Sequence, residues 1–401
     1  MQTKMIMMKY FNLGIIGITF GLLLLTSCEE DPEAQLDIAE NFLNLPSTPF
    51  NYSSIDLPDH LTQNVLIGNS QNAAIANDNT PSTNLTTDDG ATLGRVLFYD
   101  KSLSKNGTVS CASCHQQGKG FSDDATLSLG FDGGTTRRHS MSLVNAVWYG
   151  RERFFWDERA ATLEEQVLMP LQDPVEMGMT LDEVEYVVQS QPYYPQLFEN
   201  AFSTDEVNTE RIANALAQFV RSIVSYSSKY DVARADVRIQ IDNFPQFTAS
   251  ENNGKRIFFL PVEQGGAGCA GCHSTEAFIN PDNGTTNNGL DAVSTDDLGV
   301  YETFPQPIFL GTFKVPSLKN IELTAPYMHD GRFETLEEVI EHYNSGVKNH
   351  PNLAGALRDN TTGMPKRLNL TGQQKTDIIN FLKTLTDETI AEDEKFSDPF
   401  I

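Results

Sequence analysis

Basic residues are scarce in this chain of 401 residues. It has 28 Lys and Arg against 54 Asp and Glu, which gives a formal net charge of −26 at pH 7. Lys and Arg adjoin one another in pairs at most, at Arg137-Arg138, Lys255-Arg256 and Lys366-Arg367. Because an acidic chain repels phosphates unless basic side chains gather in one patch, this composition argues against a nucleic-acid partner.

Cysteine is also rare, and runs that alternate like a strand are scarce. The five cysteines stand at positions 28, 111, 114, 269 and 272, so two close pairs leave one over. With 39% hydrophobic residues the chain can bury a sizeable core, which excludes wholesale disorder. At about 150 residues to a domain, the length suggests two or three domains.

The odd cysteine, Cys28, follows an N-terminus that has the pattern of a signal peptide. Lys4 and Lys9 precede the apolar run 11–25, which is shorter than the roughly 20 residues that span a bilayer. Leu-Thr-Ser-Cys at its end resembles a bacterial lipobox. We therefore expect residues 1–27 to be a lipoprotein signal peptide and Cys28 a lipid anchor, which places the protein in the periplasm, at the outer membrane or at the cell surface. An ordinary signal peptide or a membrane-anchor helix is the alternative.

The other four cysteines form two C-x-x-C-H motifs. Their members are Cys111, Cys114 and His115 in the first motif, and Cys269, Cys272 and His273 in the second. In c-type haem attachment, two thiols at this spacing add to the haem vinyl groups, and the following histidine binds the iron. We therefore predict two covalently bound haem c groups, each with its motif histidine as an iron ligand.

Three other uses of paired cysteines fit this pattern less well. Zinc sites hold their C-x-x-C pairs typically ~12–20 residues apart, whereas these two pairs are far apart. A thioredoxin-like motif lies near a βαβ pattern, and neither pair follows a buried strand. Structural disulfides form in oxidising compartments, but they do not need a histidine after each pair. Zinc and disulfide pairing stay as alternatives.

The two motifs are preceded by similar segments. Both read Gly, a basic residue, an aliphatic residue and Phe, beginning at Gly94 and at Gly254, and a glycine-containing loop follows each. Such self-similarity suggests two related haem domains in tandem. We expect a mainly α fold of two cytochrome c-like domains with long haem-lining loops. The expected boundaries are a polar tether at 28–87, haem domains at 88–245 and 246–390, and a tail at 391–401. Docking of the apolar stretches 42–45 and 65–67 on the domain is the alternative to a tether that is free throughout.

Cap residues predict three helix starts. Thr209 precedes apolar residues at helical spacing and is expected to cap a helix. Thr335 with Glu338, and Thr371 with Gln374, have the spacing of capping boxes, in which each end of the pair bonds to the backbone of the other.

Several further stretches resemble the bacterial dihaem cytochrome c peroxidase family, which includes the MauG branch. With the haem motifs, the resemblance covers about residues 88–387. It implies an oxidoreductase whose first haem reacts with peroxide and whose second haem transfers electrons. The stretches are Phe-Phe-Trp-Asp-Glu-Arg-Ala at 154–160, Leu-Glu-Glu-Gln at 163–166, Asp-Pro-Val-Glu-Met at 173–177, Phe-Lys-Val-Pro-Ser-Leu-Lys-Asn at 313–320 and Leu-Thr-Ala-Pro-Tyr-Met-His-Asp-Gly at 323–331.

The resemblance assigns three residues to catalysis. By position, Glu176 matches the distal-pocket carboxylate of the family, Gln166 its companion glutamine, and Trp156 the tryptophan between the two haems. A base at the position of Glu176 can move a proton to the leaving oxygen while the O–O bond of peroxide splits. The alternatives are that Glu176 is a solvated loop acid and that Trp156 is ordinary aromatic core.

Two departures from the peroxidase pattern concern iron ligands. The loop 128–134 lacks the histidine that caps the first iron in typical peroxidases, so we expect a first haem open to peroxide without reductive activation. His139 as a displaceable cap is the alternative. At the second haem, Tyr343 stands where peroxidases have a methionine and where the MauG branch has a tyrosine. Its rival as sixth ligand is Met364, and core packing is a further role for Tyr343.

The resemblance also implies a calcium ion between the domains. Thr324 and Pro326 match positions that offer backbone carbonyls, and oxygen ligands suit calcium. His139, however, falls where the family has an asparagine ligand, so the donor set differs from the family's.

Taken together, the motifs predict a dihaem c-type peroxidase that reduces hydrogen peroxide to water. Its electrons would come from a small cytochrome c or cupredoxin, for which the acidic charge suggests a basic face. One alternative is a MauG-like oxidase that acts on side chains of a partner protein, and another is a dihaem electron carrier. Membrane contact is expected through the lipid anchor alone, and both a monomer and a homodimer stay open.

Overall fold

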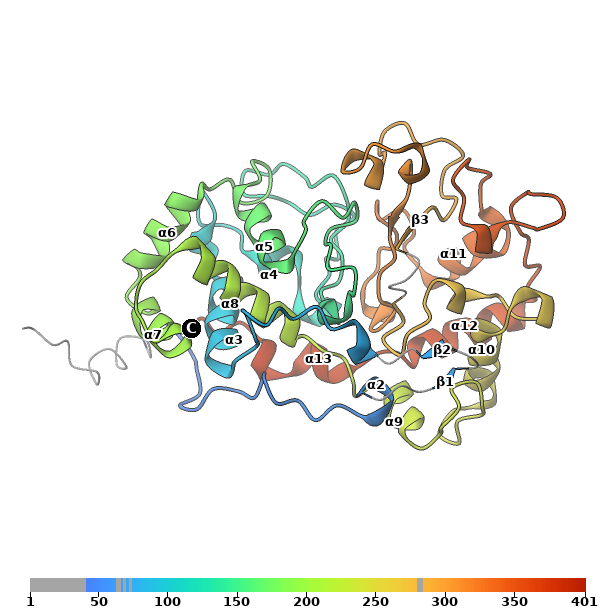
Figure 1. Cartoon of the computed structure of the whole chain (residues 1–401), viewed down its shortest axis with the longest axis horizontal. Coiled ribbons are helices and arrows are strands. Elements are labelled where there is room, and N and C mark those ends of the chain that lie inside the picture. The colour runs from blue at the N-terminus through green and yellow to red at the C-terminus, as the bar shows by residue number, and fades with distance from the viewer. Residues whose placement is uncertain (1–40, 63–65, 68–69, 72–73, 280–283) are drawn as a thin grey trace, which may run out of the picture.

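The protein is mainly helical, as expected, and has little sheet (Figure 1). The computed structural model describes residues 41–62, 66–67, 70–71, 74–279 and 284–401. Within them, two antiparallel strand pairs form, β1 (Leu66–Ile67) with β2 (Ser70–Gln71) and β3 (Thr285–Thr286) with β4 (Phe313–Lys314). The described α-helices are α2 (Asp59–Thr62), α3 (Asp88–Tyr99), α4 (Cys111–Cys114), α5 (Leu163–Gln172), α6 (Leu181–Ser190), α7 (Tyr194–Phe202), α8 (Thr209–Ser222), α9 (Lys229–Ala235), α10 (Ala249–Phe259), α11 (Leu336–Glu341), α12 (Gly372–Lys383) and α13 (Glu388–Glu392).

Side-chain caps begin the three helices that the sequence predicted. Both predicted capping boxes are present, at the starts of α11 and α12. Helix α8 begins at Thr209, but its cap is Asn208, whose side-chain oxygen accepts a hydrogen bond from the backbone N–H of Arg211 (3.0 Å). The prediction that Thr209 is the cap was wrong by one residue, because asparagine is an equally good cap and the Thr209 hydroxyl bonds to Glu185 instead.

The buried apolar residues form two clusters, and α3 crosses α8 in the first of them. Gly94 permits this crossing, because a Cβ at that position would lie 2.0 Å from the carbonyl oxygen of Ala215. The next residue, Arg95, is buried, and its Nε donates to the carbonyl of Ser397 (2.8 Å). The C-terminal segment is thereby joined to the first cluster, where Phe396 is also buried.

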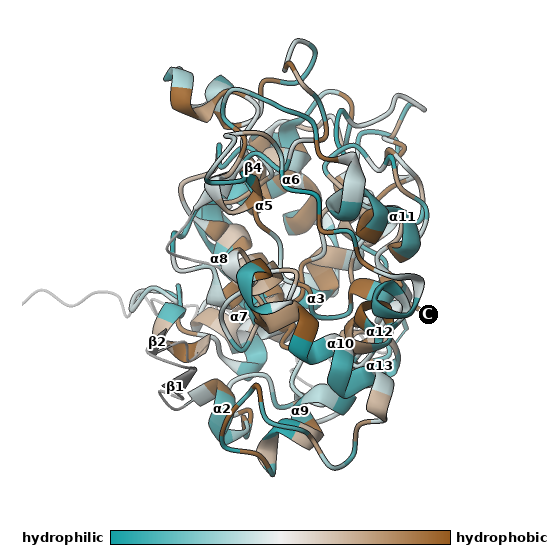
Figure 2. Ribbon diagram, turned by 90° about the vertical axis from the view of Figure 1, so that its right-hand side faces the viewer, coloured by the Kyte–Doolittle hydropathy of each residue, from teal (hydrophilic) through white to brown (hydrophobic). Residues whose placement is uncertain are grey.

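The second cluster repeats this arrangement with α10 and α12. A Cβ on Gly254 would lie 1.8 Å from the carbonyl oxygen of Asp377. The adjacent Lys255 is buried, and its Nζ donates to the carbonyl of Gln240 (2.7 Å). The two similar segments of the sequence therefore have one physical role, a close helix crossing at glycine followed by a buried cation bonded to backbone carbonyls. Figure 2 shows hydrophobic and hydrophilic residues alternating along α10 and α12, as expected for half-buried helices.

Residues 41–62, called here the N-terminal strap, pack along the folded protein. Leu43 and Tyr52 are buried in the first cluster, and the Tyr52 hydroxyl donates to the carbonyl of Lys395 (2.5 Å). Figure 1 shows the strap in blue, running along the lower edge towards α9. The docking that the sequence allows for the apolar stretch 42–45 of the predicted tether is present at Leu43, and Tyr52 extends the contact with the core beyond that stretch.

The far end of the strap is fastened by a buried charge cluster. His60 Nε2 lies 3.0 Å from a carboxylate oxygen of Asp231 in α9, and Lys319 Nζ lies 2.5 and 2.6 Å from the two oxygens of the same carboxylate. All three side chains are at most 2% exposed. Burial by itself would raise the pKa of Asp231, but Lys319 and His60 lower it to about 2. The carboxylate is therefore ionised at neutral pH and binds the strap to the second half of the chain.

Membrane attachment was predicted for a part of the chain that the structure does not describe. The apolar run 11–25 and Cys28 lie outside the described residues, so the signal peptide and the lipid anchor stay predictions. Among the residues that are described, no helix has the length and apolar character needed to cross a membrane.

Candidate haem sites and the residues between them

The first C-x-x-C-H motif lies at the wall of a cavity of about 470 Å³, called here cavity 1. Helix α4 carries both cysteines and ends at His115, whose Nδ1 bonds to the carbonyl of Phe121 (3.0 Å). With Nδ1 engaged, Nε2 is the ring nitrogen left for a metal. Burial lowers the pKa of His115, which keeps the imidazole neutral, as ligation requires.

The second motif has the same geometry at a cavity of about 210 Å³, called here cavity 2. Cys269 begins the short 3₁₀ helix Cys269–Gly271, and Cys269, Cys272 and His273 all line the cavity. His273 Nδ1 bonds to the carbonyl of Phe278 (3.1 Å). Burial lowers the pKa of His273 to about 4.

The same unusual backbone conformation orients the two carbonyls that bond to His115 and His273. Phe121 and Phe278 have φ angles of 58° and 56°, in the left-handed region that phenylalanine rarely adopts. Both rings are fully buried, so core packing holds the strained backbone that points each carbonyl at its histidine. Sequence reasoning missed these two residues, although each follows its motif histidine at nearly the same distance.

The described cysteines are available for covalent attachment, because all four are free thiols. Burial raises the pKa of Cys111 and of Cys269 to about 12. No group of three or more His, Cys, Asp and Glu among the described residues is arranged to hold a metal ion, so geometry gives the zinc alternative no support. Paired thiols beside a neutral imidazole at a cavity wall fit haem c at both sites.

Glu176 lines cavity 1 together with Cys114 and His115. Its side chain is half-buried, and burial raises its pKa to about 7, to which the charge of Asp173 adds while Arg159 opposes. A carboxyl group with a pKa near neutrality can both accept and return a proton. This is not the environment of a solvated loop acid.

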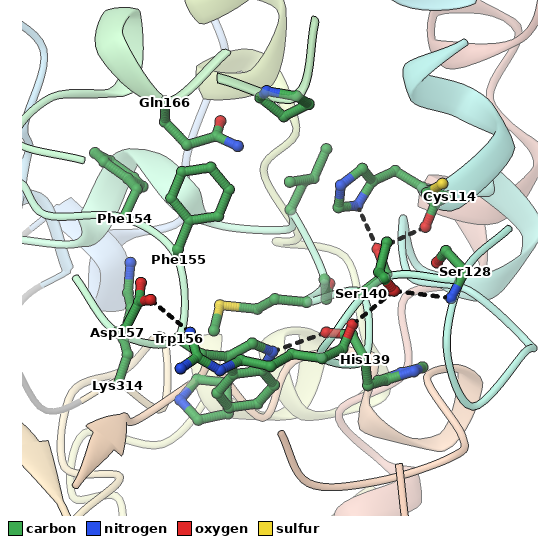
Figure 3. A pocket seen from close by; sticks show the side chains of 18 of the residues that line it. Cys114, Ser128, His139, Ser140, Phe154, Phe155, Trp156, Asp157, Gln166 and Lys314 are labelled. Atoms are coloured by element: carbon green, nitrogen blue, oxygen red, sulfur yellow. Dashed lines mark hydrogen bonds and ion pairs between the residues drawn. The ribbon is translucent and has the colours of Figure 1, made fainter. Parts of the chain in front are cut away.

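Gln166 also lines cavity 1, from α5, whose first turn is capped by Thr162. Figure 3 shows the Gln166 amide beside Phe155, on the side of the cavity opposite Cys114. The position of a neutral amide across from the attachment motif suits binding of a small polar substrate. The structure therefore brings Glu176 and Gln166 to one cavity with the first motif.

The loop 128–134 packs against the segment that carries Glu176. The Phe131 N–H donates to the carbonyl of Glu176 (3.0 Å), and a Cβ on Gly130 would lie 1.6 Å from the carbonyl oxygen of Val175. Glycine is therefore required where the loop crosses this segment. The residue that the loop contributes to the wall of cavity 1 is Ser128, which cannot cap an iron as a histidine does.

His139 lines cavity 1, but hydrogen bonds occupy its ring. Nδ1 lies 3.1 Å from the carbonyl oxygen of Ala125, and Nε2 lies 3.2 Å from the hydroxyl of Ser122. Its backbone connects the two cavities, because its carbonyl accepts from Trp156 Nε1 (2.8 Å) and its N–H donates to the carbonyl of His329 (2.8 Å). These contacts favour a structural role over that of a displaceable cap.

Trp156 lines both cavities, and Figure 3 shows its ring near His139. Its carbonyl accepts from the N–H of Lys314 (2.9 Å), which also lines both cavities. Lys314 Nζ is buried 3.3 Å from the ring centroid of Tyr149, and burial lowers its pKa to about 7. Lys314 was not assigned a role from sequence, although it belongs to the Phe-Lys-Val-Pro stretch.

The rivals for the sixth ligand at the second haem lie in different places. Tyr343 lines cavity 2 from the π-helical turn His342–Gly346 that follows α11, together with Leu336 and Ile340 on the same face. Met364 is 53% exposed on an outer loop and does not line cavity 2. Met328 does line it, with its sulfur 3.4 Å from the side-chain nitrogen of Asn288. Geometry therefore favours Tyr343 over Met364 and leaves Met328 as a further candidate.

The residues at the predicted calcium site differ from the calcium ligands of the family. Thr324 approaches Gly120, so its segment lies against the loop of the first motif. His139 offers no oxygen where an asparagine was expected, and calcium prefers oxygen ligands. Calcium at Thr324 and Pro326 stays a prediction, and no step of the chemistry below depends on it.

These features define a mainly helical protein with two cysteine–histidine attachment sites joined by an aromatic residue. The family model for di-haem cytochrome c peroxidase matches residues 88–237. MauG of Methylorubrum extorquens, a methylamine utilization protein, is 34% identical over 314 residues, which cover 78% of this chain and 82% of that protein. Cytochrome c551 peroxidase of Nitrosomonas europaea is 34% identical over 273 residues, covering 63% of this chain and 72% of that protein.

A solved structure agrees with these relatives. The crystal structure of a MauG-like protein associated with microbial copper homeostasis has a TM-score of 0.70 and 32% sequence identity, covering 86% of this chain and 99% of that one. The chain belongs to the di-haem cytochrome c peroxidase family, which includes MauG. It is an oxidoreductase of the dihaem peroxidase type, and membership of the family implies two c-type haems.

Proposed function

We propose that this protein reduces hydrogen peroxide to water with electrons from a small cytochrome c or a cupredoxin. The observation that carries the proposal is a half-buried carboxyl group, Glu176, with a pKa of about 7 at the wall of cavity 1. The haem beside it would supply an iron that binds peroxide and takes up electrons. The proposal also assigns residues 88–245 and 246–390 to two haem domains. One helix crossing in each range supports it, although Tyr230, Ala233 and Phe244 pack in the second cluster.

The side chains around cavity 1 each have a part in the reaction. Ionised Glu176 accepts the proton of bound peroxide and delivers it to the oxygen that leaves as water. Gln166 holds the substrate by hydrogen bonding, while Phe155 excludes water from that side of the cavity. Two electrons and two protons are consumed for each peroxide. Glu176 only moves a proton that peroxide already carries, so both consumed protons and both electrons must arrive from outside the cavity.

Electrons would enter at cavity 2 and leave it past Trp156. The tryptophan lines both cavities and is fixed by its indole N–H bond to His139, so its ring has one orientation. Transfer between redox centres falls off steeply with distance, and an aromatic ring between them shortens the gap. The first haem would accept peroxide without reductive activation, since loop 128–134 provides no histidine and the His139 ring is engaged elsewhere.

A MauG-like oxidase is the second candidate function, favoured by Tyr343 at cavity 2 and by the similarity to MauG. The two candidates differ in their reductant. A reduced small c-type cytochrome, mixed with the holoprotein and peroxide, should be oxidised rapidly in the ratio of two cytochromes to one peroxide. Slow cytochrome oxidation together with a long-lived oxidised form of the protein would contradict the peroxidase proposal and support the oxidase. The carrier alternative is not supported, because the chain belongs to a family of enzymes.

We expect Tyr343 to be the sixth ligand of the second iron. Burial raises the pKa of Tyr343, so the phenol keeps its proton until a metal replaces it. Tyr343→Met should raise the potential of the second haem and change its EPR signal, because axial ligands set haem potentials over a range of ~0.8 V. Redox titration with EPR measures both. Met364→Leu, the exposed control, should change neither, and a change on Met328→Leu without one on Tyr343→Met would identify Met328 as the ligand.

We also propose that the protein is exported and held at a membrane by lipidated Cys28. The proposal depends on the basic and apolar N-terminus and on the Leu-Thr-Ser-Cys sequence. A Cys28→Ala variant that stays in the membrane fraction like the parent protein would contradict it.

A further inference from the structure

Three aromatic rings form a continuous run from the wall of cavity 1 into cavity 2. Trp156 lines both cavities, while His329 and Phe313 line cavity 2. The ring centroids of Trp156 and His329 are 6.4 Å apart, with the planes at 69°. His329 in turn stacks on Phe313 at 3.7 Å and 15°. The residue that continues the path from Trp156 is therefore the imidazole of His329.

Backbone hydrogen bonds from separate segments hold these rings in register. The carbonyl of His139 accepts from the Trp156 indole N–H, and the N–H of His139 donates to the carbonyl of His329, each at 2.8 Å. Lys314, next to Phe313 in β4, donates its N–H to the carbonyl of Trp156 (2.9 Å). The backbone of His139 thus bonds to both Trp156 and His329. Phe313 is held by its position in β4.

Ion pairs close the outer side of this run. Arg138 Cζ lies 5.7 Å from the Phe313 ring centroid, and its guanidinium bonds to Asp157 (2.5 Å) and Asp297 (2.8 Å). His329 is 8% exposed. The His329 imidazole is therefore largely dry and stays in one orientation against Phe313, while Trp156 and Phe313 are half-buried at the cavity walls. A rigid, dry contact of this kind favours electron transfer, because little has to reorganise when the charge passes.

We propose that His329 is a second aromatic relay, in series with Trp156, for electrons that pass from the haem at cavity 2 to the haem at cavity 1. The proposal rests on the placement of the two haems in the proposed function. In this step the iron at cavity 2 is oxidised and the iron at cavity 1 is reduced by the same electron, and both rings return to their starting state. His329 thereby acts on the rate of transfer and does not touch the substrate.

The test measures inter-haem transfer directly, without peroxide or a protein donor. A laser flash with a soluble ruthenium photoreductant reduces the haem at cavity 2, and absorbance follows the electron to the other haem. His329→Leu should slow this step by at least about tenfold, or ~1.4 kcal/mol of barrier, while His329→Phe, which restores an aromatic ring, should recover most of the rate. His350→Leu is the matched control, because its buried imidazole lines neither cavity.

Redox titrations and haem spectra of each variant separate a relay from a structural effect. The relay predicts that both potentials stay at their values in the parent protein while the transfer rate falls. The proposal is overturned if His329→Leu transfers at the parental rate, if His329→Phe is as slow as His329→Leu, or if shifted potentials account for the slower rate. Failure of the proposed function would show differently, as no peroxide turnover with a reduced cytochrome in a protein whose inter-haem transfer is intact.

Discussion

Glu176→Gln is expected to slow peroxide turnover by about 10²–10⁴, the usual contribution of an acid–base group, with both haems still attached. Glutamine keeps the size of the side chain but cannot accept the proton of bound peroxide. Stopped-flow mixing of the holoprotein with peroxide measures the loss. Glu165→Gln is the matched control, because Glu165 is exposed on α5 and does not line cavity 1. A turnover within about threefold of the parent would remove Glu176 from the reaction.

The pKa of Glu176 gives this prediction a second readout. Because the ionised form accepts the proton and the pKa is about 7, the rate of the parent protein should rise with pH through 7 and then level off. Arg159 lowers the pKa of Glu176, so Arg159→Met should move this rise of the rate, called here the pH limb, to higher pH. In the Glu176→Gln variant the limb should vanish. A parent profile without a limb near pH 7 would mean that another group carries the proton.

Asp231→Asn should destabilise the protein by ~3–5 kcal/mol, because breaking a buried ion pair leaves the charge of Lys319 uncompensated. The change would also weaken the bond of the strap, through His60, to α9. Urea unfolding of the holoprotein measures the loss. The exposed pair Lys105–Glu183 is the control, since Lys105→Ala should cost ~0–1 kcal/mol. Equal effects of the two changes would show that the buried cluster does not hold the strap.

The decline of the free energy of unfolding at acid pH offers an independent check on the cluster of His60, Asp231 and Lys319. Asp231 has a folded-state pKa lowered to about 2, so its contribution is fully present above the ordinary aspartate pKa of ~3.9 and is lost as the pH falls towards 2. Asp231→Asn should therefore flatten the decline in stability between about pH 4 and pH 2. An unchanged decline would be assigned to other carboxylates.

The chemistry of the attachment sites could be predicted from sequence because it is local. Each C-x-x-C-H motif places its thiols and its imidazole within about one turn, so the spacing alone brings them together. The glycine–basic segments are equally local, since Gly94 and Gly254 lie within single helices. The sequence did not reveal that Phe121 and Phe278 aim the carbonyls, because a left-handed φ at phenylalanine is stabilised by core packing and leaves no pattern in the residue type.

Residues that act across long separations were harder to assign. Match to the family by position points to Tyr343, with Met364 as its rival. Burial separates the two, since of this pair the tyrosine lines cavity 2. Met328 and His329 lie in the stretch 323–331, but the sequence gives neither a contact partner, because their neighbours come from distant segments. The strap resembles a tether in composition, and a few apolar side chains are enough to bind it to the core.

The sequence by itself determined the two haem attachment motifs, the helical character, the helix caps and the membership of a dihaem family. Only the tertiary structure placed Trp156 at both cavities, stacked His329 on Phe313, and buried Glu176 deeply enough to raise its pKa to about 7. The physical reason for this division is that motifs and caps form between residues within about one turn, so spacing along the chain determines them. Burial, ring stacking and pKa shifts depend instead on which distant segments meet, and the packing of the whole core decides that.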